Sequence, residues 1–195
     1  MKLDIILAGV GGQGILSIAT VIGEAATAAG VNLKQAEVHG MSQRGGDVQS
    51  NLRLSNEEIC SDLIPKGKAD LIIAMEPMEA LRYVPYLSAE GWIVTSSQPF
   101  VNIPNYPDPK ALSDEIASYK HCVSLDIETL AKDNKMPRSA NMILLGMAAP
   151  FIGILTPEQL RAAVRRIFAS KGEEVASANE AAFDLGFSLA SKAAR

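Results

Sequence analysis

Apolar runs of strand length alternate along the chain with apolar stripes of helical spacing. The first run begins at Leu3 and breaks into glycines from Gly9, and apolar residues then recur at helical spacing from about Gly14 to Ala29. A second strand is predicted over Leu33–Val38. Strand, glycine turn, helix and strand make a βαβ unit, and its right-handed crossover predicts that both strands lie in one parallel sheet.

The rest of the chain continues this alternation. Strands are predicted over Asp47–Leu54, Ala69–Met75, Gly91–Thr95 and His121–Leu125. Helices are predicted over Pro77–Leu87, Ala111–Ala117, Ile127–Asp133, Ser139–Phe151 and Glu173–Lys192, with one more beginning at a capping box of Thr156 and Gln159. Prolines between Pro99 and Pro109 predict an irregular connection. We therefore predict an α/β fold: a Rossmann-like, mostly parallel sheet with helices on both faces and a helical C-terminal segment.

The length, the net charge and the apolar stretches of the chain exclude several classes of protein. A chain of 195 residues suits one domain, with residues 1–125 as the sheet core and residues 126–195 mainly helical. The net charge of −4, with no basic stripe, gives no reason to expect nucleic acid as a partner. The longest apolar stretch, Met142–Leu155, is shorter than the ~20 residues that span a bilayer. Asp4 interrupts the apolar run that a signal peptide would need, so neither a leader nor a membrane span is expected.

The two cysteines, Cys60 and Cys122, match no metal spacing. They cannot supply the four thiolates of an iron–sulfur cluster, so any such cluster must lie on another chain. Their scarcity fits a reducing compartment and predicts a cytoplasmic protein.

The glycine turn is the first candidate binding site. Its pattern is Gly9-x-Gly11-x-x-Gly14 between a predicted strand and a predicted helix. Free N–H groups at the start of a helix, together with the helix dipole, favour phosphate or another anion. The candidate residues are Gly9, Gly11, Gly12, Gln13 and Gly14. The alternative is a tight turn that binds nothing.

A second glycine-bearing loop follows the second predicted strand. Arg44 offers a planar fork for phosphate or carboxylate, Gly45 and Gly46 allow close backbone approach, and Ser42 and Gln43 add neutral donors. Because both loops follow parallel strands, both should emerge at the carboxyl edge of the sheet. The alternative is that Arg44 pairs with an acidic residue and the glycines only make a turn.

Three further residues lie near this predicted edge. Glu37 stands about where a ribose-binding carboxylate falls in a dinucleotide fold, which leaves open a stand-alone NAD- or FAD-binding oxidoreductase. His39 is a candidate for hydrogen bonding or proton transfer, although a lone histidine is more often structural. Glu76 ends a predicted strand and is expected to line the crevice. No lysine of the Walker type follows the glycines, which argues against ATP hydrolysis.

Three segments together resemble the gamma-type module of the 2-oxoacid:ferredoxin oxidoreductases. They are Gly9–Gly14, Glu37–Gly46 and the pattern Val48-x-Ser50-x-x-Arg53. The second is the most specific, because the series His-Gly-Met-Ser-Gln-Arg-Gly-Gly resembles the small (beta) subunit of the indolepyruvate ferredoxin oxidoreductases within that family. The likeness covers essentially the whole chain.

The resemblance implies a heteromeric enzyme in which this chain is inactive alone. The reaction it implies is oxidative decarboxylation of an aryl pyruvate with coenzyme A, giving aryl-acetyl-CoA, carbon dioxide and reduced ferredoxin. The large (alpha) subunit would carry thiamine diphosphate, Mg and 4Fe-4S clusters, with ferredoxin as the electron acceptor. This chain would help to bind coenzyme A (CoA) and close the thiamine site, with Gly11–Gly14 and Ser42, Gln43 and Arg44 as candidate contacts. No residue of this chain is assigned to catalysis or to a metal.

Overall fold

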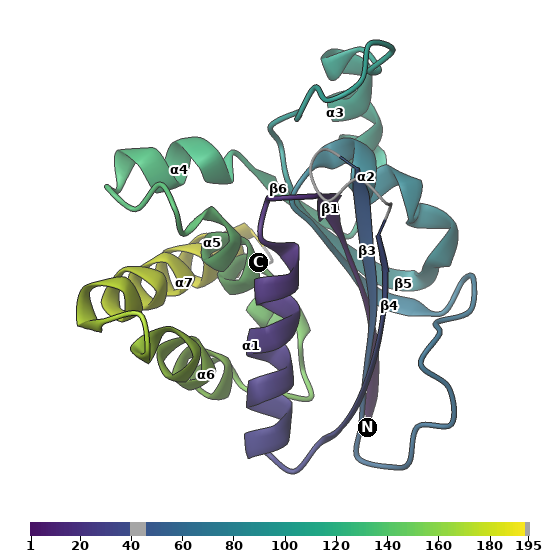
Figure 1. Ribbon diagram of the computed structural model, residues 1–195. Coiled ribbons are helices and arrows are strands. Elements are labelled where there is room, and N and C mark those ends of the chain that lie inside the picture. Colours follow the sequence, from purple (N-terminus) through teal and green to yellow (C-terminus); the bar gives the residue numbers. More distant parts are fainter. Residues whose placement is uncertain (40–45, 194–195) are drawn as a thin grey trace.

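A computed structural model describes residues 1–39 and 46–193, and in it a mixed six-stranded sheet forms the centre of the molecule (Figure 1). The strand order is β2-β3-β1-β4-β5-β6. The strands are β1 (Lys2–Val10), β2 (Asn32–His39), β3 (Asp47–Ser55), β4 (Ala69–Ala74), β5 (Leu87–Ser96) and β6 (Cys122–Leu125). The prediction of an α/β fold with a mostly parallel sheet is confirmed.

The position of β2 differs from the prediction. β1, β4, β5 and β6 pair in parallel, whereas β3 is antiparallel to both β1 and β2. The two strands of the predicted βαβ unit therefore run in the same direction in one sheet, but they do not pair. The connection after β2 is short enough for a hairpin, which favours an antiparallel return, and β3 occupies the place beside β1.

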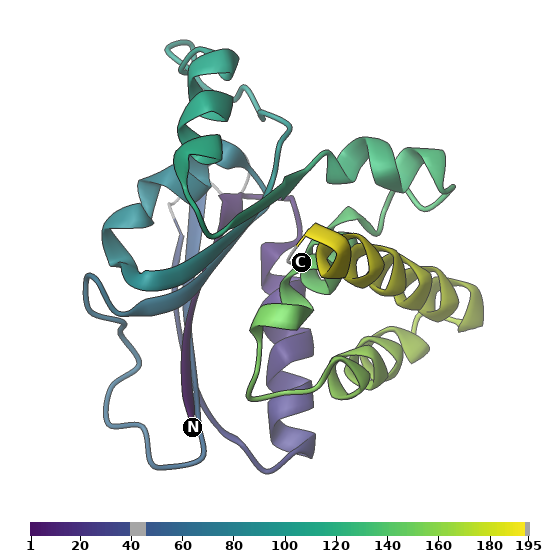
Figure 2. The ribbon, with the colours of Figure 1, turned by 180° about the vertical axis from the view of Figure 1, so that it is seen from behind.

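Helices cover both faces of the sheet (Figures 1 and 2). On one face, α1 (Ile15–Ala28) and α5 (Ala140–Ala148) pack against the sheet. α6 (Pro157–Ala169) and α7 (Glu173–Ala193) pack on these two helices, with α4 (Ile127–Asp133) beside them. The other face is covered by α2 (Pro77–Arg82) and α3 (Pro109–Ser118). Successive side chains of a strand point to opposite faces, so Ile5 and Leu7 enter the first core while Ile6 and Ala8 enter the second.

Prolines shorten two of the predicted helices. The helix expected over Pro77–Leu87 ends at Arg82 and is followed by the 3₁₀ turn η1 (Val84–Tyr86), which contains Pro85. The helix expected over Ser139–Phe151 is α-helical only to Ala148, and Pro150 lies in the 3₁₀ turn η2 (Ala149–Phe151). Both changes follow from the missing N–H of proline, which cannot continue the α-helical hydrogen-bond pattern.

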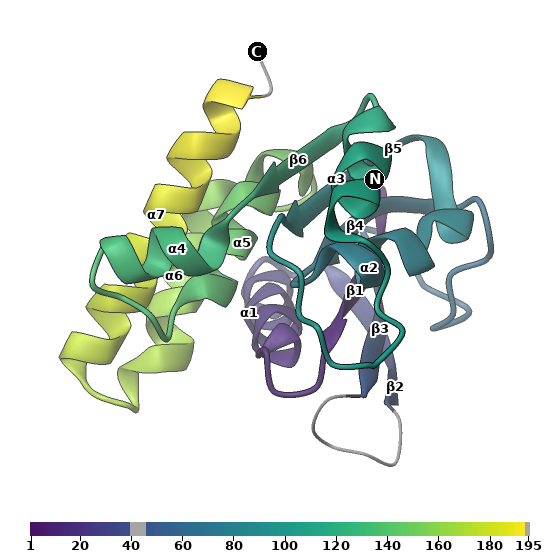
Figure 3. The same cartoon turned by 90° about the horizontal axis from the view of Figure 1, so that it is seen from above.

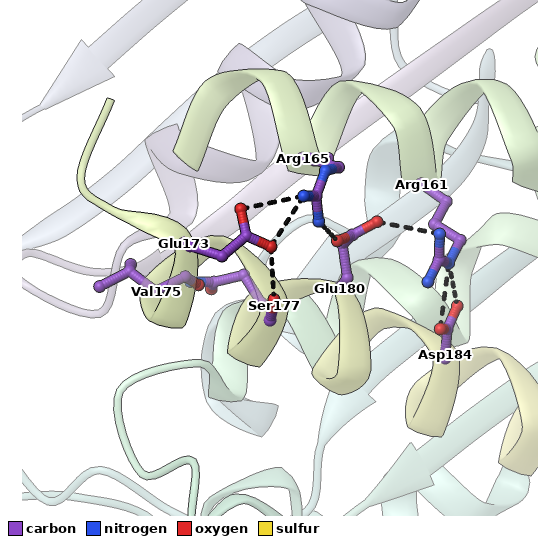
Figure 4. A network of polar contacts seen from close by, with 8 residues as sticks. Arg161, Arg165, Glu173, Val175, Ser177, Glu180 and Asp184 are labelled. Atoms are coloured by element: carbon purple, nitrogen blue, oxygen red, sulfur yellow. Dashed lines mark hydrogen bonds and ion pairs between the residues drawn. The ribbon is translucent and has the colours of Figure 1, made fainter. Parts of the chain in front are cut away.

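A predicted cap begins α6, and an ion-pair network joins α6 to α7. The backbone N–H of Gln159 donates to Thr156 Oγ1 at 3.2 Å, and the Thr156 N–H donates to Gln159 Oε1 at 2.8 Å, so the capping box is confirmed. Glu180 of α7 is buried between two arginines of α6, at 2.9 Å from Arg161 and 2.6 Å from Arg165 (Figure 4). The ion pairs to Glu180 hold the last two helices together.

All described elements after Leu125 are helical. The prediction that the whole chain forms one domain divided near residue 125 stays a prediction. Of the helices in residues 1–39 and 46–193, none combines the length and the apolar character needed to cross a membrane.

Candidate functional site

The carboxyl edge of the parallel strands gathers the candidate residues. The glycine turn follows β1, Glu76 follows β4, and the proline-rich segment, residues 97–108, follows β5. Because β1, β4 and β5 are parallel neighbours, all three segments emerge at the same edge, which Figure 3 views from above.

The glycine turn is closed by its own glutamine. The backbone N–H of Val10 donates to Gln13 Oε1 at 2.7 Å, and the Gln13 N–H donates to the Val10 carbonyl at 3.1 Å. Gly12 has φ +103°, and a Cβ atom there would find no heavy atom within 4 Å. The side-chain oxygen of Gln13 therefore shapes the turn, while the space beside Gly12 is open.

Two other glycines of the turn allow close packing. A Cβ atom on Gly9 would lie 3.3 Å from the Cβ atom of Met75, the residue that directly follows β4. Gly14 is the N-cap of α1 with φ +81°, and a Cβ there would lie 2.8 Å from Asn141 Nδ2. The Asn141 amide donates to the Gly14 carbonyl at 3.1 Å, so α5 is tied directly to the turn. Sequence analysis missed Asn141, because 127 positions separate the two residues and no local pattern links them.

One hydrogen bond joins the glycine turn to the end of the second candidate loop. The backbone N–H of Gly11 donates to the carbonyl of Gly46 at 2.8 Å, so the end of the second loop lies against the glycine turn. This contact confirms the prediction that both loops emerge at one edge. Ser42, Gln43, Arg44 and Gly45 lie outside the described residues, and the assignment of a ligand to either loop stays a prediction.

Glu37 is poorly placed for a dinucleotide. Its carboxylate is exposed on β2 and accepts a hydrogen bond from Gln35 Nε2 at 2.7 Å. β3 separates β2 from β1, so Glu37 belongs to a strand about 10 Å from the glycine strand, judged by two interstrand spacings. In a dinucleotide fold the acidic residue follows the strand that pairs with the glycine strand.

Glu76 is fully buried rather than lining an open crevice, so that expectation is wrong. Its carboxylate is the N-cap of α2 and accepts from the Glu79 N–H at 2.9 Å. It also accepts from the Phe100 N–H at 3.3 Å and from the Tyr106 hydroxyl. Burial, the hydrogen bond to Glu76 and the nearby charges of Glu76 and Glu79 raise the pKa of Tyr106, so this hydroxyl stays a donor.

The charges beside Glu76 are mainly acidic. Burial raises the pKa of the Glu79 carboxyl, although Arg82 opposes the shift through a bond of 2.9 Å between its Nε and Glu79 Oε2. Burial, followed by the charges of Asp47 and Glu79, raises the pKa of Tyr83 to about 12. An anion at this edge would therefore depend on backbone N–H groups and on a cation that is not already paired.

Arg53, the arginine of the third motif segment, lies away from this edge. Its register partner is Asp4 near the start of β1, and its Nε donates to Asp4 Oδ1 at 2.8 Å. Its Nη1 also donates to the carbonyls of Ser61 and Leu63, both at 3.0 Å. Arg53 thus anchors the β3–β4 connection at the opposite end of the sheet. In the described part of the chain, no three His, Cys, Asp or Glu side chains gather into a possible metal site.

Known proteins with similar sequences are subunits of oxidoreductases. The chain is 35% identical, over 97% of its length and 96% of the relative, to indolepyruvate oxidoreductase subunit IorB of Thermococcus kodakarensis. It is 36% identical, over 98% of its length and 100% of the relative, to the subunit of the same name from Methanothermobacter thermautotrophicus. The sequence family described as pyruvate ferredoxin/flavodoxin oxidoreductase matches residues 4–189, and the chain belongs to this family.

The fold has a counterpart of known structure. The 2-oxoglutarate:ferredoxin oxidoreductase of Magnetococcus marinus, solved with 2-oxoglutarate, coenzyme A and succinyl-CoA bound, superposes with a TM-score of 0.75 at 24% identity. The superposition covers 98% of this chain but 31% of the other, so the same fold there forms part of a much longer chain. The resemblance found in the sequence is confirmed at the level of family and fold.

Proposed function

We propose that this chain is the cluster-free small subunit of a thiamine-dependent 2-oxoacid:ferredoxin oxidoreductase acting on indolepyruvate or a related aryl pyruvate. The complete enzyme would decarboxylate the 2-oxoacid oxidatively with CoA, releasing aryl-acetyl-CoA, carbon dioxide and reduced ferredoxin. A large subunit would hold thiamine diphosphate, Mg and the 4Fe-4S clusters. Family membership and the names of the relatives support this function, as does the presence of only two cysteines in this chain. The cysteine content also supports a cytoplasmic location.

The hydrogen bond between Gly11 and Gly46 is the observation that carries the role of this chain. It brings the glycine turn and the end of the arginine-bearing loop to one point at the carboxyl edge. The N–H groups of Val10, Gly11 and Gln13 already have partners within the site, so the other N–H groups of the turn, together with the guanidinium of Arg44, would bind the phosphates of CoA. Fixing the acyl acceptor at this edge would accelerate transfer mainly through proximity, while thiamine and the clusters of the large subunit supply the bond-breaking and redox chemistry.

Reconstitution tests the proposal. The purified chain is expected to be inactive, and adding its large subunit should give ferredoxin reduction that depends on both a 2-oxoacid and CoA. A mixture with no such activity, or a purified chain that retains stoichiometric NAD or FAD, would contradict the proposal. The second result would favour a stand-alone dinucleotide-binding oxidoreductase.

A further inference from the structure

Exposed apolar side chains are concentrated at the carboxyl edge of the sheet. Residues 97–107 contain no charged side chain, and they expose Phe100, Val101 and Ile103. Leu16 and Val38 are exposed at the same edge, on the first turn of α1 and near the end of β2. Five of the eight exposed large hydrophobic side chains of the described residues therefore lie along the edge that carries the candidate site.

Hydrogen bonds, two of them to the buried carboxylate of Glu76, hold residues 97–107, the apolar segment, in this exposed position. The buried carboxylate of Glu76 accepts from the Phe100 N–H at 3.3 Å and from the Tyr106 hydroxyl. At the start of the segment, the Ser97 N–H donates to the Leu125 carbonyl at 2.9 Å, and Gln98 Nε2 donates to Asp126 at 2.5 Å. Prolines at several positions restrict the backbone further. The exposed side chains are thus presented by an anchored backbone.

A fixed, uncharged apolar surface beside a ligand site is typical of a protein interface. Related proteins are subunits, and the same fold occupies only 31% of the longer Magnetococcus marinus chain, so the fold also functions beside further domains. The apolar segment and the glycine turn emerge at the same edge of the sheet, so a protein seated on that edge would face both. The apolar surface, its position at the edge that carries the glycine turn and the subunit relatives together favour one binding partner for this surface, the large subunit that completes the catalytic site.

We propose that the apolar segment is a docking surface for the large subunit and that Glu76, through Tyr106 and the Phe100 backbone, positions it. The inference rests on the proposed function, because it assigns a surface to the partner which that function requires. Val101, with 67% of its surface exposed, would lie at the centre of the contact, and the uncharged segment would be desolvated there without burying an ion.

The test compares Val101→Asp with Leu63→Asp. Leu63 is 57% exposed and lies in the β3–β4 connection at the opposite end of the sheet, so it is a matched control. Binding of the large subunit is measured by mass photometry without 2-oxoacid or CoA, and thermal unfolding followed by the fluorescence of Trp92 verifies that both variants are folded. Val101→Asp should raise the Kd at least tenfold, whereas Leu63→Asp should leave it within about twofold.

Equal binding by the two variants would overturn the docking surface. A homodimer of this chain that Val101→Asp separates would overturn it as well, because the occupant would then be a second copy. If the wild-type chain binds no large subunit at all, the proposed function itself fails, and this result is distinguishable from failure of Val101→Asp alone.

A second pair of variants tests the positioning role of Glu76. Tyr106→Phe removes one donor to Glu76, whereas Tyr119→Phe removes a hydroxyl that bonds only the Glu115 carboxylate among the contacts of the described residues, at 3.3 Å. Tyr106→Phe should weaken binding several-fold while the protein remains folded at the assay temperature, whereas Tyr119→Phe should leave binding unchanged. Unchanged binding by Tyr106→Phe would overturn the positioning role.

Discussion

Gly146 of α5 and Gly186 of α7 mark the point where these two helices cross with their backbones in contact. A Cβ atom on Gly146 would overlap the Phe183 carbonyl of α7, and a Cβ atom on Gly186 would overlap the Ile143 carbonyl of α5. The two glycines thus allow an approach that no other residue type permits. α5 also carries Asn141, whose amide binds the glycine turn, so this crossing holds part of the site in place.

Gly146→Ala should destabilise the protein, because the added methyl group has no room and the helices must separate. We expect the free energy of unfolding to fall by about 1–3 kcal/mol or more, the range for overpacked cores. Urea unfolding measures this loss. Gly153→Ala is the matched control, since its Cβ would meet no atom within 4 Å and its backbone has no positive φ. Equal stability of the two variants would contradict the close crossing.

Gly12→Ala should impair CoA use in the reconstituted enzyme. The added methyl group would project into the open space beside the turn, where the proposed phosphate lies. Gly172 has the same φ of +103° and the same lack of neighbours, but it lies between α6 and α7. Both variants should lose about 1–2 kcal/mol of stability from the left-handed backbone. Only Gly12→Ala should raise the KM for CoA, by about tenfold, equivalent to ~1.4 kcal/mol.

Arg44→Ala should raise the KM for CoA more than the KM for the 2-oxoacid. A hydrogen bond to a charged group contributes about 1.5–3 kcal/mol, which corresponds to a change of at least about tenfold. Steady-state kinetics of the reconstituted enzyme measure both constants, with the exposed Arg138→Ala as the control. An unchanged CoA response would show that the His39–Gly46 loop has been assigned the wrong role.

Asp4 should contribute to stability at neutral pH and lose this contribution in acid. Burial acts to raise its pKa, but hydrogen bonds from Arg53 and Lys2 outweigh burial and leave the pKa below the ordinary value of 3.8. A depressed native pKa stabilises the fold above pH 3.8, and the effect disappears as the pH falls through the native value.

The variant Asp4→Asn tests this pH dependence. It should cost about 3–5 kcal/mol at neutral pH, because Arg53 would be left without its buried partner. Urea midpoints measured from about pH 6 to about pH 2.5 should fall less steeply for the variant than for the wild type. Parallel curves would mean that Asp4 is not a source of the acid sensitivity.

Local patterns were sufficient to predict most elements and the edge at which the two candidate loops meet. The apolar run of β1, the glycine turn after it and the capping box of Thr156 each lie within a few consecutive positions. Their physical causes are equally local: side-chain periodicity, the positive φ values of Gly12 and Gly14, and orphan N–H groups at a helix start. The family resemblance depended on the same short segments.

No local pattern in the sequence predicted the contacts between distant segments. The insertion of β3 between β1 and β2 depends on competing strand pairings, which the alternation within one strand does not distinguish. The bond from Tyr106 to Glu76 and the bond from Asn141 to Gly14 join residues that are 30 and 127 positions apart.

The sequence by itself therefore determined the elements, the family and the edge at which the candidate loops emerge. Only the tertiary structure decided the order of the strands, the buried role of Glu76 and the crossing at Gly146 and Gly186. The reason is physical: hydrophobic periodicity specifies which face of an element is buried, whereas packing between distant segments selects the partner that covers it.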